Sequence, residues 1–278
     1  MRIKFTILFI VILAATAAIV EGVPQKAMDW FQGISTSSSH ENLSGLLRGS
    51  LESFAGSNLT SEGIVTWTNN QREQQGQTAL HNNLALQKAA EAKLDDMFTK
   101  QYFEHESPDG KMPSDIIKTA GYAYLVVGEN LALGNFKNDE ILVQAWMDSP
   151  GHRANILNSK FQEIGVAARK GTFEGKDVWL AVQEFGSPLS SCPSPGSNLK
   201  DELSANRATL ADLQNQIKDQ KAIIDANKFK TEAEYNQAIA NYNALVRRSN
   251  SLGEQTAGQV ERYNESVNDF NACLESNT

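Results

Sequence analysis

The fold is decided by the sequence WMDSPGHRANIL, residues 146–157. Ser149 is a residue type that caps helices, and Pro150 is favoured at the first helical position, so a helix is expected to begin here. His152 follows within the first turn of that helix. The stretch therefore predicts a helix that holds an imidazole near its N-terminus, preceded by another helix at residues 139–146.

The residues before this stretch have helical periodicity, and the residues after it alternate as strands do. Three helices are expected before it, bounded by Thr60 and Gly76, by Asn83 and Phe98, and by Pro113 and Gly121. A strand is expected at residues 122–127, ended by Gly128, and two more where apolar residues alternate at 164, 166, 168 and at 178, 180, 182. Helices followed by a closing antiparallel sheet predict an α+β sandwich.

Four further polar motifs accompany residues 146–157, namely YFEHESPDG (102–110), GEN (128–130), EIGV (163–166) and QEFG (183–186). In this order the five motifs resemble the CAP superfamily of cysteine-rich secretory, antigen-five and pathogenesis-related-one proteins, also called SCP-like domains. The form SPGHRxNIL resembles the bacterial branch of that family. The resemblance spans residues 59–187, and it implies an α-β-α sandwich.

The resemblance also implies a cleft lined by two histidines and two acids. Carried over by motif, His105, Glu129 and His152 occupy three of the four positions. The fourth is expected to be Asp148, which follows the Trp that opens the histidine segment. Glu163 is ranked lower because it lies at the start of a strand. The disulfides that the family carries within the domain are missing here.

Two imidazoles and a carboxylate support three kinds of chemistry. They can bind Zn or another divalent metal, act as a general acid and base, or form a buried hydrogen-bonded network. The first hypothesis is an extracytoplasmic binding or interaction module whose cleft holds a metal or a small ligand. The alternative is a metal-assisted hydrolase acting on cell-surface peptides or polymers, although the sequence offers no evident nucleophile. Whether the protein is an enzyme stays open.

The N-terminal segment predicts export from the cytoplasm. Residues 1–20 have a basic start, an apolar run and small residues, which fit a signal peptide or an N-terminal membrane anchor. Residues 21–58 are rich in Ser and Gly and lack a sustained period, so a flexible linker is expected there. The protein is therefore predicted to be secreted or membrane-anchored.

The C-terminal segment predicts a second, purely helical part. Residues 188–197 form a linker of Pro, Ser and Gly, and residues 198–278 carry two heptad seams interrupted near Asn227. An antiparallel helical hairpin, or coiled coil, with a turn at residues 227–231 is expected.

The chain has two cysteines, Cys192 and Cys273, which flank that hairpin. With the turn at residues 227–231, the segments between the hairpin and each cysteine are long enough for the two sulfurs to meet. In an oxidising compartment the expectation is one disulfide. The alternative is two free thiols.

Composition limits the classes of partner. The chain of 278 residues has a formal net charge of −8 and a pI near 5.1, so it offers nucleic acid no overall electrostatic attraction. The expected partners are a cell-surface protein, a lipid or a small ligand. Self-association through the helical hairpin is a further possibility.

Overall fold

A computed structural model describes residues 40–52, 54 and 56–277. The predicted signal peptide or anchor at residues 1–20 lies outside these residues. The described chain belongs to two compact units, one holding the sheet and the other the two long helices, and each is described by itself. Of the helices in the described part of the chain, none combines the length and the apolar content needed to cross a bilayer.

The sheet unit is built on five strands in the order β1-β3-β5-β4-β2. Strand β5 (Lys176–Pro188) lies in the centre and pairs antiparallel with β3 (Tyr124–Gly134) and β4 (Glu163–Phe173). Two parallel neighbours complete the sheet, β1 (His40–Arg48) beside β3 and β2 (His81–Asn82) beside β4. The predicted antiparallel pair of β4 and β5 is thus confirmed.

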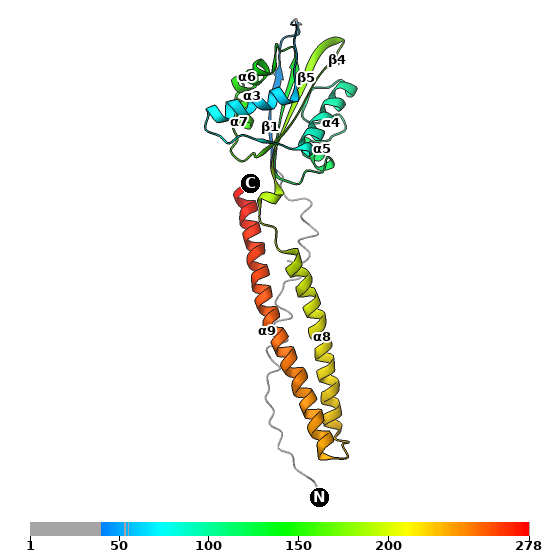
Figure 1. Ribbon diagram of the computed structural model, residues 1–278. Coiled ribbons are helices and arrows are strands. Elements are labelled where there is room, and N and C mark those ends of the chain that lie inside the picture. Colours follow the sequence, from blue (N-terminus) through cyan, green and yellow to red (C-terminus); the bar gives the residue numbers. More distant parts are fainter. Residues whose placement is uncertain (1–39, 53, 55, 278) are drawn as a thin grey trace. The chain divides into compact units, whose positions relative to one another are not determined.

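Helices cover both faces of this sheet (Figure 1). One face packs against α3 (Ser61–Gln74), α6 (Asp139–Asp148) and α7 (Pro150–Ile156). The other packs against α4 (Leu84–Lys100) and α5 (Pro113–Thr119). The predicted α-β-α sandwich is therefore confirmed.

The side chains of β5 point alternately to the two faces of the sheet, so this strand packs against both helical layers. Val178, Leu180 and Val182 are buried against α4, whereas Trp179 and Ala181 are buried against the α3 and α6 side. Both faces are apolar because both are covered by helices, as is usual for a sheet between two helical layers.

The predicted helix starts are confirmed, with one difference in chemistry. Thr60 caps α3 by accepting a hydrogen bond from the Gly63 amide, and Asn83 caps α4 in the same way. Ser149 also precedes its helix, but its side chain makes no capping hydrogen bond. Its hydroxyl contacts a ring nitrogen of His152 instead.

Two sequence predictions about strands need correction. The predicted linker at residues 21–58 contains strand β1, because the backbone of residues 40–48 pairs with the otherwise open edge of β3. The strand predicted to end at Gly128 continues to Gly134. Gly128 is paired with strands on both sides, and glycine is needed there because a Cβ would lie 2.7 Å from the Phe161 ring and 3.0 Å from the Asn42 carbonyl oxygen.

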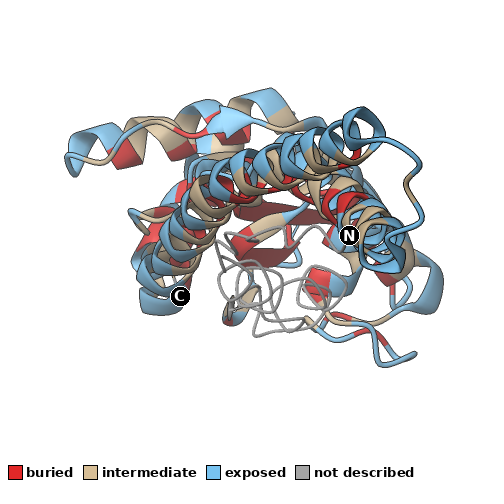
Figure 2. Ribbon diagram, turned by 90° about the horizontal axis from the view of Figure 1, so that it is seen from below, coloured by how far each residue is buried: buried red, intermediate tan, exposed pale blue. Residues whose placement is uncertain are grey.

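The helical unit consists of α8 (Ser197–Ala226) and α9 (Glu232–Asn277). Asn206 donates a hydrogen bond to Gln259, and Gln220 donates one to the carbonyl of Ala238. The residue numbers of these pairs rise along one helix and fall along the other, which confirms the predicted antiparallel hairpin. The outer sides of the two helices are exposed (Figure 2).

The predicted disulfide is formed between Cys192 and Cys273, with Cα atoms 5.7 Å apart. Cys192 follows a short 3-10 helix, η1 (Leu189–Ser191), at the end of the sheet. Cys273 lies in the last turns of α9. The alternative of two free thiols is therefore wrong for this structure.

Candidate functional site

The site is centred on a contact between His105 and Glu129. His105 lies in the loop after α4, and Glu129 lies in the middle of β3. The His105 Nδ1 and Glu129 Oε1 atoms are 2.5 Å apart. The Glu129 side chain is fully buried, whereas 13% of the His105 side chain is exposed. Burial alone would lower the pKa of His105, but the hydrogen bond and negative charge of Glu129 raise it above its usual value.

The second ring nitrogen of His105 is held by strand β1. His105 Nε2 bonds to the backbone carbonyl of Ser44, and the Ser44 hydroxyl donates to the backbone carbonyl of Glu129 at 3.1 Å. Both nitrogens of His105 are therefore occupied by this chain's own groups. If the ring is protonated, both nitrogens act as donors, which agrees with a carboxylate and a carbonyl as partners.

A second acid lies beside Glu129, and the sequence analysis missed it. Glu184 of β5 is directly opposite Glu129 in the antiparallel register, and its side chain is fully buried. Burial, followed by the charge of Glu129, raises the pKa of Glu184 well above its usual value. When Glu184 is protonated it can donate a hydrogen bond to Glu129, whose Oε2 has no other partner among the described residues.

A buried lysine offsets the charge of these acids. Lys93 of α4 is fully buried, and its ammonium donates to the carbonyl of Glu104 at 2.8 Å and to the carbonyl of His105. It also lies 4.9 Å from the centre of the Tyr102 ring. Burial lowers the pKa of Lys93, while the nearby Glu129 and Glu184 oppose that change. Lys93 therefore fixes the loop that carries His105 as well as supplying positive charge.

His152 approaches the site from the opposite helical layer. It is 1% exposed, its Nδ1 is 2.7 Å from the Ser149 hydroxyl, and its Nε2 has no hydrogen-bond partner among the described residues. Burial, and then the positive charge of His105, lowers the pKa of His152 to about 4. His152 is thus close enough to His105 for the charge of one ring to lower the pKa of the other. It is nevertheless neutral at pH 7 and buried from solvent.

The other two predicted acids do not join this cluster. Asp148 is exposed and accepts a hydrogen bond from Gln144 on its own helix, so the structure does not bring it to Glu129. Glu163 accepts a hydrogen bond from the Tyr122 hydroxyl at 2.6 Å.

A polar network on the α7 side ties the motifs together. Asn155 lies within hydrogen-bond distance of the carbonyls of Asn42 and Glu129 and of the Asn130 side chain. Asn130 in turn donates to the Gln183 side chain at 3.0 Å. All these amides are buried or nearly so, which explains why polar residues stand in otherwise apolar strands.

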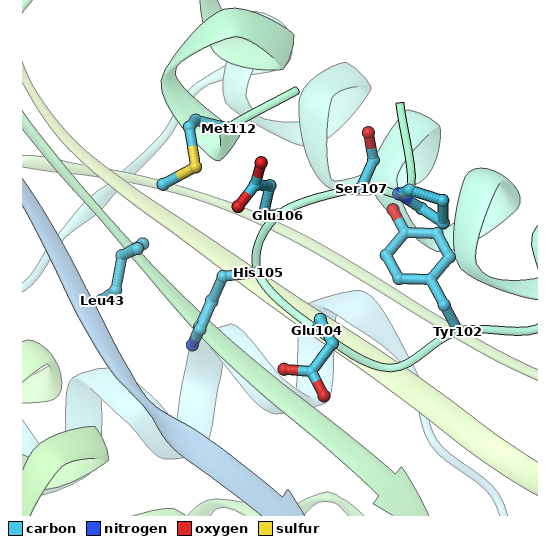
Figure 3. A pocket seen from close by; sticks show the side chains of 8 residues that line it. Leu43, Tyr102, Glu104, His105, Glu106, Ser107 and Met112 are labelled. Atoms are coloured by element: carbon cyan, nitrogen blue, oxygen red, sulfur yellow. The ribbon is translucent and has the colours of Figure 1, made fainter. Parts of the chain in front are cut away.

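An open hollow adjoins His105 on the α4 side (Figure 3). Its volume is about 450 Å³, within the range of small-ligand sites. Its lining combines apolar groups with exposed acids and consists of Leu43, Tyr102, Glu104, His105, Glu106, Ser107, Pro108 and Met112. The hollow is therefore the accessible part of the site.

The arrangement does not fit the predicted zinc or other divalent metal site. Within the described ranges, no three His, Cys, Asp or Glu side chains are placed to share one ion. Both nitrogens of His105 already have partners, and the unpartnered nitrogen of His152 is buried in the other layer.

Comparisons with known proteins find relatives for the residues that form this site. Residues 65–185 match the model of the cysteine-rich secretory protein family, CAP. Over 122 residues the chain is 44% identical to the uncharacterized protein YkwD of Bacillus subtilis, a match covering 44% of this chain and 45% of YkwD. It is 29% identical to the uncharacterized membrane protein YlbC of the same organism, a match covering 37% of this chain and 30% of YlbC.

A solved structure also matches this part of the chain. It is an extracellular protein containing a SCP domain from Bacillus anthracis, with 27% identity and a TM-score of 0.40 over 45% of this chain and 39% of the other. The match thus spans less than half the length of each of these three proteins. Residues 65–185, which carry His105, Glu129, His152 and Glu184, form a domain of the CAP family.

Proposed function

We propose that the chain is an extracytoplasmic binding module whose CAP domain takes a ligand, without turnover, in the hollow beside His105. The observation that carries this proposal is an open hollow of about 450 Å³ next to a buried, charged cluster. Leu43 is 39% exposed at its wall and offers apolar surface to a ligand.

The disulfide supports a location outside the cytoplasm. Disulfides such as Cys192–Cys273 persist in oxidising compartments and are rare in the cytosol. The apolar start of the chain, residues 1–20, agrees with export. The similar protein of Bacillus anthracis is described as extracellular.

The lining suggests the chemistry of the ligand. Met112 and Leu43 offer apolar surface, and the exposed carboxylates of Glu104 and Glu106 stand near it (Figure 3). A ligand with an apolar body and a positive charge would satisfy both features, because apolar contact supplies affinity and the acids select the charge.

The alternative of a hydrolase has no observation in its favour. The closest hydroxyl and imidazole in the cluster are those of Ser149 and His152, at 2.7 Å. His152 is only 1% exposed, so a substrate could not reach this pair. A general base also needs access to the proton that it removes.

The proposal is tested with two probes of the same shape and opposite charge, tetraphenylphosphonium and tetraphenylborate, titrated calorimetrically into the full chain. The cation is expected to bind once per chain, and the anion at least about tenfold more weakly, a difference of about 1.4 kcal/mol. Failure of the cation to bind, or equal binding of both probes, would contradict the proposal.

A matched pair of variants locates the binding. Met112→Ser removes the apolar wall at a helix N-cap, where serine is well tolerated, and should weaken cation binding about fivefold. Leu84→Ser removes a leucine that is 66% exposed at the start of α4, away from the hollow, and should leave binding unchanged. Equal losses in the two variants would show that binding is unspecific.

A further inference from the structure

Strand β1 lies outside the residues matched by the family model, yet it closes the site. The matched region begins at residue 65, whereas β1 covers His40–Arg48. The strand pairs in parallel with β3 at the edge of the sheet, so that Leu43 stands opposite Glu129. It therefore occupies an edge that the CAP domain would otherwise present to solvent.

The domain holds β1 mainly through the backbone of β1. The carbonyl of Ser44 bonds to His105 Nε2, and the carbonyl of Asn42 lies 3.0 Å from the side-chain nitrogen of Asn155. The ladder with β3 adds further backbone pairs. Contacts of this kind recognise an extended chain with little regard for its side chains.

In β1 the position with little space for a larger side chain is Ser44, which is buried. The register shifts between Leu43 and Leu46, and the residues of this bulge, Ser44 and Gly45, pass close to α7. A Cβ added at Gly151 would be 3.3 Å from the Gly45 amide nitrogen and 3.6 Å from Ser44 Cβ. The groove between β3 and α7 is therefore narrow at this point.

Strand β1 buries fewer of its side chains than its neighbour β3. Among the residues of β1 whose side chains are described, only Ser44 is buried, and Leu43 is 39% exposed. In β3 every residue from Leu125 to Gly134 is buried. Because apolar burial supplies most of the stability of a strand, β1 is expected to open more easily than the rest of the sheet.

We infer that β1 stands in for the natural ligand, and that the site is a groove for an extended polypeptide segment of a partner, which pairs with β3 in place of residues 40–48. Such a segment would carry a small residue where Ser44 lies and an apolar residue where Leu43 faces the hollow. This inference goes beyond the proposed function, because the segment would replace β1, including Leu43 at the wall of the hollow, and would not fill the hollow itself.

The test uses the full chain with a specific protease site inserted after Gly56. Gly56 is exposed, and a Cβ added there would meet nothing within 4 Å, so the insertion begins at a position with open space around it. After cleavage β1 is no longer covalently attached to β3. A fluorescent peptide HENLSGLLR, residues 40–48, should then bind once per chain, and the uncut chain should not bind it. The same peptide carrying Ser44→Trp should bind about tenfold more weakly, because its bulge no longer fits beside α7.

A locked variant supplies the control. Ser44→Cys with Gly151→Cys would place two Cβ atoms about 3.6 Å apart, a separation that a disulfide spans. The cleaved and oxidised double variant should not exchange its strand, whereas the Ser44→Cys single variant should. Equal peptide binding by both variants, or no binding by the cleaved chain, would overturn the inference.

A second measurement does not depend on cleavage. In the intact chain, hydrogen exchange at the amides of β1 should be at least about tenfold faster than in β3 and β5. Equal protection of β1 and β5 would also overturn the inference. Dimers that form by exchange of residues 40–48 between copies would reassign the groove to a second copy of this chain. Binding of tetraphenylphosphonium to the uncut chain, without peptide exchange, would leave the proposed function intact and remove only the inference about β1.

Discussion

The two histidines of the CAP domain come from opposite helical layers and have opposite properties. His105 lies on the α4 side, contacts Glu129, and has a raised pKa. His152 lies on the α7 side, is 1% exposed, and has a pKa lowered to about 4. The same residue type is thus placed to carry charge in one layer and to stay neutral in the other.

Strand β3 explains how one short motif serves both layers. Successive residues of a strand point to opposite faces, so Glu129 faces α4 and Asn130 faces α7. Glu129 pairs with His105, and Asn130 donates to the carbonyl of His152 at 3.3 Å. Glu129 and Asn130 are adjacent in one motif, yet they lie in separate environments, one ionic and one made of neutral amides.

The largest effect is expected from removing the cation on the α4 side. Lys93→Met should lower the free energy of unfolding by about 3 kcal/mol, because it leaves the carbonyls of Glu104 and His105 without their donor and removes a buried positive charge near Glu129 and Glu184. Denaturant unfolding at pH 7 measures this change. Lys100→Met on the same helix is the matched control, since Lys100 pairs with Asp96 and Asp109 at the surface, and its stability should change little. Similar losses in the free energy of unfolding of both variants would show that the buried position of Lys93 adds no stability beyond that of a surface lysine.

A smaller effect separates the histidines by pH. Because the folded pKa of His152 is about 4, below the usual 6.5, the unfolded chain takes up this proton first as the pH falls. Stability from this group is therefore present above pH 6.5 and is lost between about pH 6.5 and 4.

Unfolding measured between pH 4 and 7 in the wild type and in His152→Gln tests this assignment. The variant cannot titrate at this position, so its stability should fall less steeply with falling pH. His105 has the opposite sign, since its raised pKa contributes stability at low pH that is lost as the pH rises through that pKa. Identical slopes in the two proteins would mean that His152 does not titrate as assigned.

The layers of the fold could be predicted because their signals are local. Thr60 and Asn83 mark helix starts by their own hydrogen bonds, and apolar alternation at residues 178–182 marks a strand. The heptad seams likewise fix the hairpin, whose turn falls between Ala226 and Glu232 as predicted. Each of these features depends on neighbours within a few residues along the chain.

The second acid could not be located in the same way. Asp148 was favoured by its position in the sequence, but its helix turns it to solvent, and Glu184 reaches Glu129 only through the register of β3 and β5. A usable signal existed, because Glu184 continues the inward alternation of Val178, Leu180 and Val182. An acid in such a series is expected to be buried and to need a partner.

Strand β1 was missed for a different reason. Its residues have little apolar periodicity, and Ser44 and Gly45 interrupt what there is. It becomes a strand because the edge of β3 offers backbone partners, a condition that the sequence of residues 40–48 does not contain. Lys93 was missed similarly, since the acids that favour its buried charge, Glu129 and Glu184, lie on two strands distant in the sequence.

The smallest change in stability is expected from a substitution at Glu184, and it tests whether this acid is neutral or ionised in the folded protein. Glu184→Gln keeps the shape of the side chain and supplies a donor where the protonated acid would donate to Glu129, so stability at pH 4 should change by less than about 1 kcal/mol. The wild type should then lose stability relative to this variant as the pH rises, because the unfolded chain releases the Glu184 proton at a lower pH than the folded chain does. Thermal unfolding of both proteins at pH 4 and pH 8 gives the comparison. A variant that is less stable than the wild type at pH 8 would show that Glu184 is ionised in the folded protein, and that Lys93 rather than a shared proton balances the two acids.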